Sequence, residues 1–418
     1  MSTTATSSLG LDFPEIQNLI NDVNSSNAPQ ELKTRLNSMM GRLQIAAKTG
    51  GYSTEFESIK KYIDWIKSVP WGKYTEDSLD LQQVEKLLNE HHYGLQDVKN
   101  RVLEYLAVMK LNKQPAITEA TTTTETSTTA LNTSTNIPPT AIGTEAPVTP
   151  VVPATPPANN QESSIEEMKK LRGSSESAPI LCFVGIQGVG KTSMAKSIAT
   201  ALGRQFKRVS LGAMGSSTGL RGRSRGEQDA EPGQIVKALC DTGVMNPLIL
   251  LDEIDKVSGE AGLRADVMAA LLEVLDPEQN ATFVDHFIDY PISLSQVIFI
   301  TTANNLGGIS TALLDRLEII RFSSYSPEDK KMIGRNYLLP KVRRATGLTE
   351  QQFQIAEEAW DLIISPLGFD AGVRQLERNL QNVARKVAKR IVDGIAPSVT
   401  ITPENFREFL PQDIEVYS

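Results

Sequence analysis

The sequence has 418 residues, 40% of them hydrophobic, and a net charge of −8 at pH 7, so it can bury a core and favours two or three domains. The acidic balance provides no general basic surface for nucleic acid or anionic membranes, and no apolar run reaches the ~20 residues of a membrane span. Two cysteines favour a reducing compartment, and the N-terminus has no signal-peptide or mitochondrial pattern, so we expect a cytoplasmic protein.

Residues 11–68 predict helices. Leu32, Leu36, Met39, Met40 and Leu43 recur at helical spacing, and Gly50-Gly51 interrupts that pattern. A second helix is expected with its apolar face formed by Phe56, Ile59, Ile63 and Ile66. A third helical pattern covers roughly 79–110. We expect residues 1–68 to form a short helical arm.

The composition then changes abruptly. Residues 115–160 are rich in Thr, Pro and Ala and contain neither Lys nor Arg, so they cannot bury enough apolar surface to order themselves. We interpret 113–177 as a disordered, weakly acidic insertion in a surface loop, which costs little closure entropy. A tether for binding or modification is the alternative.

A glycine-rich motif follows an apolar strand candidate at 180–185 and opens a helical pattern. It matches G-x-x-x-x-G-K-[ST] and comprises Gly185, Ile186, Gln187, Gly188, Val189, Gly190, Lys191 and Thr192, with Ser193 next. The glycines let backbone N–H groups wrap a phosphate chain, and the helix N-terminus adds partial positive charge. Lys191 is expected at the β- and γ-phosphates and Thr192 at Mg²⁺. The alternative is a glycine-rich turn with an incidental lysine.

A second motif is an apolar run, 246–251, that ends in Asp252 and Glu253. Such a run is typical of a buried parallel strand whose carboxyl end lies at an active site. We expect Asp252 to hold Mg²⁺, directly or through water, and Glu253 to polarise the attacking water. Two adjacent acids can also simply cap the next helix.

Strand and helix patterns alternate from 179 to 322. Strands are expected at 180–185, 207–211, 248–252, 296–301 and 318–322, and this alternation is typical of an α/β fold with a parallel sheet between helices. After residue 325 no strand pattern returns, and helices are expected at 328–340, 350–364 and 371–394. We therefore expect a nucleotide-binding α/β domain over 69–324 and a helical lid domain over 325–418.

The chain resembles the ATPase module of the Lon protease family, within the AAA+ superfamily, over roughly 30–112 and 178–411. The resemblance is carried in order by the strings at 62–65 (YIDW), 69–74 (VPWGKY), 92–95 (HYGL), 271–280 (LLEVLDPEQN), 313–316 (LLDR) and 371–374 (AGVR). It implies a P-loop AAA+ sheet with a helical lid, Mg²⁺-dependent ATP hydrolysis, and a homo-oligomeric ring of six subunits.

The resemblance also assigns roles to residues outside the two motifs. His92 and Tyr93 would line the adenine, and Asn304 would be sensor 1, orienting water against the γ-phosphate. From the residues alone, Asn304 could equally form a turn before Asn305 and Gly307-Gly308. His91 and His92 lack further metal-ligand neighbours at zinc spacing, so no zinc site is expected.

Two arginines complete the implied site. Arg316 would reach the γ-phosphate held by the neighbouring subunit, where negative charge develops. Without the resemblance, a surface salt bridge with Asp315 or Glu318 is the simpler reading. Arg374 would touch the phosphates and couple the lid to the nucleotide, or it is one of several arginines on a solvated helix face.

The chain also departs from the family pattern. The family carries a Ser-Lys peptidase domain and a large N-terminal substrate-recognition domain, which this sequence lacks, so we expect no peptide-bond cleavage. The segment matching the pore loop reads Glu227, Gln228, Asp229 and Glu231 within 226–231, where the family has aromatic and apolar residues, so threading of a polypeptide is in doubt. Upstream, 221–226 contains three arginines that could contact nucleic acid or pair with those acids; the acidic chain disfavours nucleic acid.

We therefore expect a Lon-like ATPase that remodels or unfolds a protein partner. Two other hypotheses remain open. The chain could be a regulatory or scaffold protein switched by its nucleotide, or the ATPase subunit of a separately encoded peptidase.

Overall fold

The computed structural model describes residues 14–48, 53–113, 180–212, 214–257, 261–364 and 372–409. Residues 1–108 and 179–418 form one compact unit, and 109–178 form a second, of which only 109–113 are described. Apart from Lys113, the expected insertion at 113–177 therefore lies outside the described residues.

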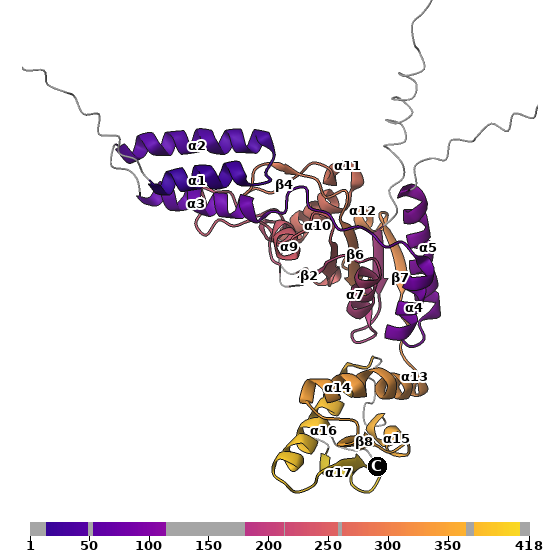
Figure 1. Ribbon diagram of the computed structural model, residues 1–418. Coiled ribbons are helices and arrows are strands. Elements are labelled where there is room, and N and C mark those ends of the chain that lie inside the picture. Colours follow the sequence, from indigo (N-terminus) through magenta and orange to yellow (C-terminus); the bar gives the residue numbers. More distant parts are fainter. Residues whose placement is uncertain are drawn as a thin grey trace, which may run out of the picture. The chain divides into compact units, whose positions relative to one another are not determined.

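Three helices form the N-terminal region, coloured indigo to violet in Figure 1: α1 (Pro14–Ser25), α2 (Gln30–Lys48) and α3 (Ser53–Ser68). Their apolar faces meet in a core that includes Ile16, Leu32, Leu36 and Ile63, each fully buried. The helical spacing of the sequence thus places its leucines and isoleucines as expected. The next helical pattern is two helices, α4 (Leu81–His91) and α5 (Gln96–Lys113), separated by a tight turn.

The central sheet has five parallel strands in the order β2-β3-β6-β1-β7 (Figure 1). They are β1 (Ile180–Val184), β2 (Phe206–Ser210), β3 (Leu248–Asp252), β6 (Ile298–Ala303) and β7 (Leu317–Arg321). All five expected strands are confirmed, each to within two residues at either end. Every residue of β3 and β6 is buried, which explains why these strands read as continuous apolar runs rather than alternating patterns.

Helices and short segments connect the strands: α7 (Lys191–Ala201), α8 (Thr218–Arg221), α9 (Gln234–Thr242), the 3₁₀ turn η1 (Ile254–Lys256), α10 (Ala261–Leu275), α11 (Pro277–Asn280), the short strands β4 (Phe283–Val284) and β5 (Pro291–Ile292), and α12 (Thr311–Leu314). Helix α7 packs against β2, β3 and β6, and it also packs against α4. Because β1 lies inside the sheet and leads into α7, the turn between them lies at the carboxyl edge, where α/β folds bind ligands.

The C-terminal region has its own core around Trp360, Phe353 and Leu376. Its helices are α13 (Pro327–Ile333), the π-helical turn η2 (Gly334–Leu338), α14 (Leu339–Thr346), α15 (Ala359–Ile364), α16 (Arg374–Val392) and α17 (Phe406–Phe409). Ser326 caps α13 in a capping box with Asp329, so the chain enters this region at a defined point.

The expectation that no strand follows residue 325 was wrong. β8 (Phe353–Ile355) pairs in parallel with β9 (Val399–Ile401), so the helix expected at 350–364 begins only at Ala359. Each strand has three residues, and the alternation that buries Phe353 and Ile401 is too short to stand out from a helical pattern. The pairing joins segments far apart in the sequence, which local patterns do not reveal.

Among the described residues, no helix is both long and apolar enough to cross a bilayer.

Candidate functional site

The glycine-rich turn joins β1 to α7 and depends on its glycines. Gly188 and Gly190 have φ angles of +85° and +95°, which only glycine adopts readily. A Cβ atom at Gly185 would lie 2.7 Å from the carbonyl oxygen of Phe322, and one at Gly188 would lie 3.1 Å from the Cβ of Arg374. The turn therefore lies close to the end of β7 and to the start of α16. Tyr325 reinforces it, because its hydroxyl donates to the carbonyl of Val189 over 2.8 Å.

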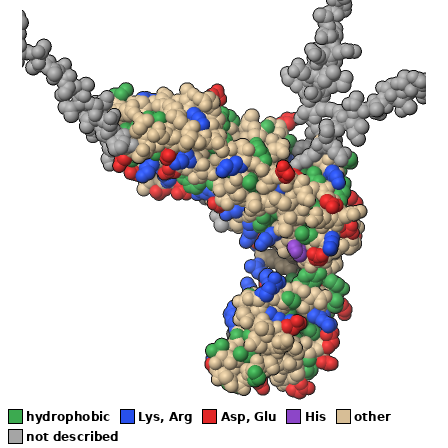
Figure 2. Space-filling model, viewed as in Figure 1, with side chains coloured by type: hydrophobic (Ala, Val, Ile, Leu, Met, Phe, Trp, Pro, Cys, Tyr) green, Lys and Arg blue, Asp and Glu red, His purple; other side chains and the backbone are tan. Residues whose placement is uncertain are grey.

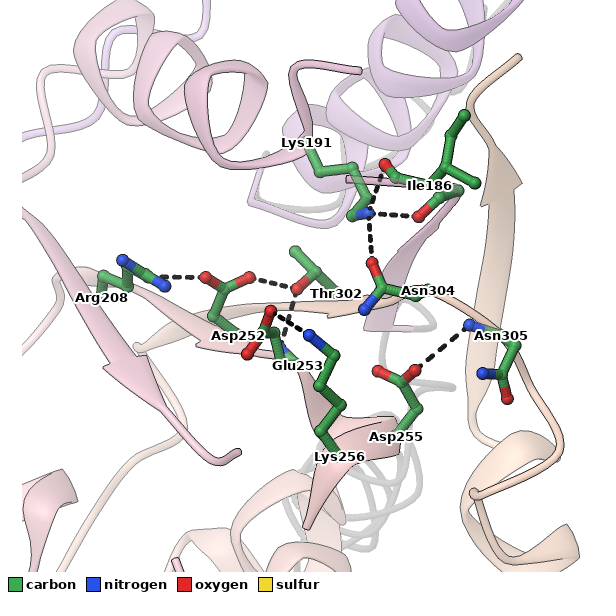
Figure 3. Close-up of polar contacts among 11 residues, drawn as sticks. Ile186, Lys191, Arg208, Asp252, Glu253, Asp255, Lys256, Thr302, Asn304 and Asn305 are labelled. Atoms are coloured by element: carbon green, nitrogen blue, oxygen red, sulfur yellow. Dashed lines mark hydrogen bonds and ion pairs between the residues drawn. The ribbon is translucent and has the colours of Figure 1, made fainter. Parts of the chain in front are cut away.

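Lys191 lies over this turn. Its Nζ donates to the carbonyl oxygens of Gly185 and of Ile186, the latter over 3.0 Å, and to Oδ1 of Asn304 over 3.1 Å (Figure 3). Burial lowers the pKa of this ammonium. The amide of Asn304, directly after β6, therefore faces the lysine. The turn predicted as the alternative for Asn304 is instead closed by Asn305, whose Oδ1 accepts from the backbone N–H of Gly307.

The two acids stand at the end of β3. Asp252 accepts from Nε of Arg208 over 2.6 Å and from the hydroxyl of Thr302, so neighbours on both sides fix its carboxylate (Figure 3). Glu253 has a φ of +61° and its carboxylate pairs with Lys256 over 2.7 Å. It precedes η1 but makes no side-chain cap hydrogen bond, so its carboxylate is not used to cap the next helix.

These elements line one cavity of about 520 Å³. Twelve residues expected at the site line it: His92, Tyr93, Gln187, Gly188, Gly190, Lys191, Thr192, Ser193, Asp252, Glu253, Asn304 and Arg374. Gly185, Ile186 and Val189 lie in the same turn but do not line the cavity. On the face of the molecule drawn in Figure 2, lysine and arginine side chains lie beside a histidine at a hollow. Positive charge at a helix N-terminus, opposite two carboxylates, suits a phosphate chain with a divalent cation.

Comparison with known proteins agrees with this geometry. Residues 181–325 match the ATPase family associated with various cellular activities (AAA), and residues 344–399 match the Lon protease AAA+ ATPase lid domain. The chain thus carries an AAA domain and a Lon-type lid domain. It is 36% identical to Lon protease 2 of Herpetosiphon aurantiacus over 98% of this chain and 43% of that protein.

Other relatives show the same partial coverage. Lon protease 1 of Bacillus subtilis is 37% identical over 96% of this chain and 44% of its own length. The mitochondrial Lon protease homolog of Homo sapiens is 37% identical over 87% of this chain and 31% of its own length. The chain thus spans less than half the length of these curated relatives, and its AAA module supports ATP binding.

Arg316 does not line the cavity of this Lon-type module. Its side chain is 41% exposed, donates to the carbonyl of Ala312 and pairs with Asp276 over 3.0 Å. A surface salt bridge is thus present, but the partner expected from sequence was wrong, since neighbouring Glu318 pairs with Arg101 instead.

The residues expected at Mg²⁺ fit that cation. Thr192 and Asp252 bring a hydroxyl and a carboxylate to the same cavity, and Mg²⁺ usually takes one or two protein oxygens together with phosphates and water. Within the described ranges, no group of three or more His, Cys, Asp or Glu could hold a metal.

Arginines just before the segment expected at the pore loop, 226–231, contact other parts of the chain. Arg225 lies 4.2 Å from the ring centre of Tyr62 and pairs with Asp289 over 3.1 Å, while Arg221 pairs with Glu273. Arg221 and Arg225 therefore pair within the chain, but not with the acids at 227–231 that the sequence suggested as their partners. Glu227, Gln228 and Asp229 are exposed, so the surface of this segment is hydrophilic.

Sequence reasoning missed several residues of the cavity, among them Arg208, Tyr325, Tyr337 and Lys341. Arg208 lies on β2, a strand that carries no motif, and its place beside Asp252 follows only from the β2–β3 register. Thr302 was also missed, although its position two residues before Asn304 at the end of a buried strand was a usable signal.

Proposed function

We propose that this chain hydrolyses ATP in the cavity described above, with the turn amides, Lys191 and Ser193 holding the phosphates and His92 and Tyr93 lining the base. The observation that carries the proposal is that four separate elements bring their side chains to one cavity. The P-loop, the end of β3, the residue after β6 and the start of α16 bring Lys191, Glu253, Asn304 and Arg374 to one cavity.

Mg²⁺ is part of this proposal. Thr192 and Asp252 would hold it, and the cation would neutralise charge on the β- and γ-phosphates. The hydrogen bonds from Arg208 and Thr302 keep the Asp252 carboxylate in a fixed orientation at the strand end, which reduces the ordering needed on binding.

Glu253 is proposed to accept the proton of the attacking water. Its ion pair with Lys256 has to open for that role, and both side chains are partly exposed, so the pair is weak. Asn304 would orient the same water, and Arg374 would contact the phosphates from the lid. Each of these groups acts on charge that develops in the transition state.

The test is the substitution Glu253→Gln. It removes the base but keeps the size and shape of the side chain, so ATP binding should persist while turnover falls by orders of magnitude. Nucleotide binding measured by fluorescence titration and phosphate release measured on the same sample separate the two effects. Normal turnover in Glu253→Gln would contradict the role of Glu253.

Arg316 is proposed to act on the ATP of a neighbouring copy. Its exposure and its absence from the lining of its own cavity support that role. The proposal requires a homo-oligomeric ring, and we propose a hexamer from the family resemblance.

For the use of the hydrolysis energy, we propose remodelling or unfolding of a protein partner without peptide-bond cleavage by these 418 residues. The exposed polar side chains at 227–229 favour the alternative of a nucleotide-switched regulatory or scaffold protein. The third hypothesis is an ATPase subunit of a separate peptidase. ATPase rates measured with unfolded protein, folded protein and DNA discriminate the three hypotheses. Unfolded protein should stimulate a remodeller or an ATPase subunit of a peptidase, but not a nucleotide-switched scaffold.

The proposed division is an arm at 1–68, a nucleotide-binding domain at 69–324 and a lid at 325–418. Limited proteolysis with and without ATP tests it, since cleavage is expected near residues 68 and 325 and inside 113–177.

A further inference from the structure

A buried lysine stands behind the proposed base-binding end of the cavity. Lys99 lies on α5 and is 3% exposed, and its Nζ donates to Oδ1 of Asn89 over 2.9 Å and to the carbonyl oxygen of His92 over 2.7 Å. Both acceptors are uncharged, and burial lowers the pKa of the ammonium. Removing a lysine ammonium from water is costly, so its retention here calls for a reason.

The segment that Lys99 holds, 89–93, connects three parts of the chain. It contains the end of α4 and leads into the turn before α5, where Gly94 and Leu95 have φ angles of +61° and +54°. The ring nitrogens of His91 and His92 each lie 3.0 Å from the hydroxyl oxygen of Ser197 on α7. The segment is thus joined to the helix that follows the phosphate-binding turn.

The same segment also contacts the lid. The hydroxyl of Tyr337 donates to the carbonyl of Asn89 over 3.3 Å, and Tyr93 packs against the lid core. His91, His92, Tyr93 and Tyr337 all line the cavity. Lys99 lines none of it and therefore acts on the cavity only through the segment.

We propose that Lys99 is a positioning residue that fixes the segment 89–93 and thereby gives the cavity its preference for adenine. This inference rests on the proposed function. Two hydrogen bonds from one ammonium hold the side chain of Asn89 and the backbone of His92, so the rings of His92 and Tyr93 are presented to the base in one arrangement. The phosphate end of the cavity is held by other residues and does not depend on Lys99.

The test compares ATP and UTP, which share the triphosphate and differ in the base. Affinities are measured by competition against a fluorescent ATP analogue, with ATPase KM and kcat alongside. In Lys99→Met, which keeps an unbranched apolar stem, ATP affinity should fall about tenfold because a charged hydrogen-bond donor is lost. UTP affinity and kcat at saturating ATP should change less than about twofold, since the phosphate contacts remain.

Three further variants serve as controls. Lys86→Met removes an exposed lysine of α4 and should leave both affinities unchanged. Lys191→Ala should weaken ATP and UTP alike. Asn89→Ala removes one acceptor and keeps the ammonium, and it should lower ATP affinity selectively but by less than Lys99→Met. If Lys99→Met lacks the wild-type melting transition, Asn89→Ala decides by the same criteria.

Equal losses of ATP and UTP affinity, unchanged ATP affinity, or a wild-type protein with no preference for ATP over UTP would each overturn the proposal. A wild-type protein that binds neither nucleotide would instead contradict the proposed function.

Discussion

The ammonium of Lys191 donates a hydrogen bond to Oδ1 of Asn304 over 3.1 Å, which joins the phosphate-binding turn to the end of β6. The two residues are far apart in the sequence and meet because β1 and β6 are neighbours in the sheet. An incoming γ-phosphate would compete for the lysine and leave the asparagine amide facing the reacting atoms. Under the proposed function, the pair would link nucleotide binding to the orientation of the attacking water.

Asn304→Ala should therefore impair turnover more than binding. Loss of one preorganised polar group facing the reaction costs on the order of 10²-fold in kcat. ATP affinity, measured by titration, should change by less than about threefold. A matched control is Asn305→Ala, which removes only a turn hydrogen bond and should keep near-normal kcat. Equal kcat in the two variants would contradict the role proposed for Asn304.

Buried His92 predicts an acid-dependent loss of stability. Burial, nearby His91 and Lys99 lower the pKa of His92 from 6.5 to about 4. The unfolded chain therefore takes up a proton at higher pH than the folded one. The stability that His92 contributes is complete above about pH 6.5 and is lost as the pH falls towards 4, by about 3 kcal/mol in full.

Urea unfolding at pH 7 and pH 5 measures this effect. The wild type should lose more stability between these pH values than His92→Gln does, because glutamine does not titrate. His286→Gln, which replaces an exposed histidine, controls for loss of an imidazole. Identical pH dependence in wild type and His92→Gln would show that His92 does not carry the effect.

A buried ion pair ties the segment before α4 to the sheet. Arg204 and Asp77 have side chains 1% and 5% exposed and meet through two hydrogen bonds of 2.6 and 2.8 Å. Arg204 also donates to the carbonyls of Asn246 and Gln296. Arg204→Met should lower the free energy of unfolding by about 3–5 kcal/mol, since it removes the cationic partner of a buried carboxylate.

Chemical denaturation at pH 7 checks this value. The control is Lys389→Ala, which breaks an exposed pair with Asp393 and should cost about 0.3–0.5 kcal/mol. Similar losses in the free energy of unfolding for the two substitutions would contradict the claim that the buried pair contributes more than the exposed one.

Asp289 joins the helical arm to the segment 222–231. It accepts from Arg35 of α2 and from Arg225, and the hydroxyl of Tyr62 on α3 donates to the neighbouring carbonyl of Ile288 over 2.7 Å. Asp289→Asn should weaken both pairs and speed amide hydrogen exchange in 222–231, with ATP affinity unchanged. Exchange that stays at the wild-type rate there would mean that other contacts hold the segment. Asp393→Asn is a surface control.

Much of the fold and site could be predicted from sequence because the determining patterns are local. The P-loop, the acids after β3 and the buried strands each lie within a single short segment, so spacing alone places them. Residues that act through pairing between segments could not be found this way. Arg208 lies beside Asp252 because of the register between β2 and β3. Arg316 pairs with Asp276, 40 positions away in the sequence, and β8 pairs with the distant strand β9.

If ATP is hydrolysed between Glu253 of one copy and Arg316 of its neighbour, the variants Glu253→Gln and Arg316→Ala each lack a different half of the site. Glu253→Gln keeps a normal arginine for its neighbour, and Arg316→Ala keeps a normal base for its own ATP. The exposed ion pair lost in Arg316→Ala should cost little stability, about 0–1 kcal/mol, so both variants should fold and assemble.

The most direct test of the central claim is therefore the ATPase rate of the two variants alone and after mixing and reassembly. We predict that each variant alone is nearly inactive and that the mixture regains a clear fraction of wild-type activity, because some sites then combine an intact Glu253 with an intact Arg316. A mixture no more active than its components, or a single variant with the wild-type rate, would contradict hydrolysis at a site shared between neighbouring subunits.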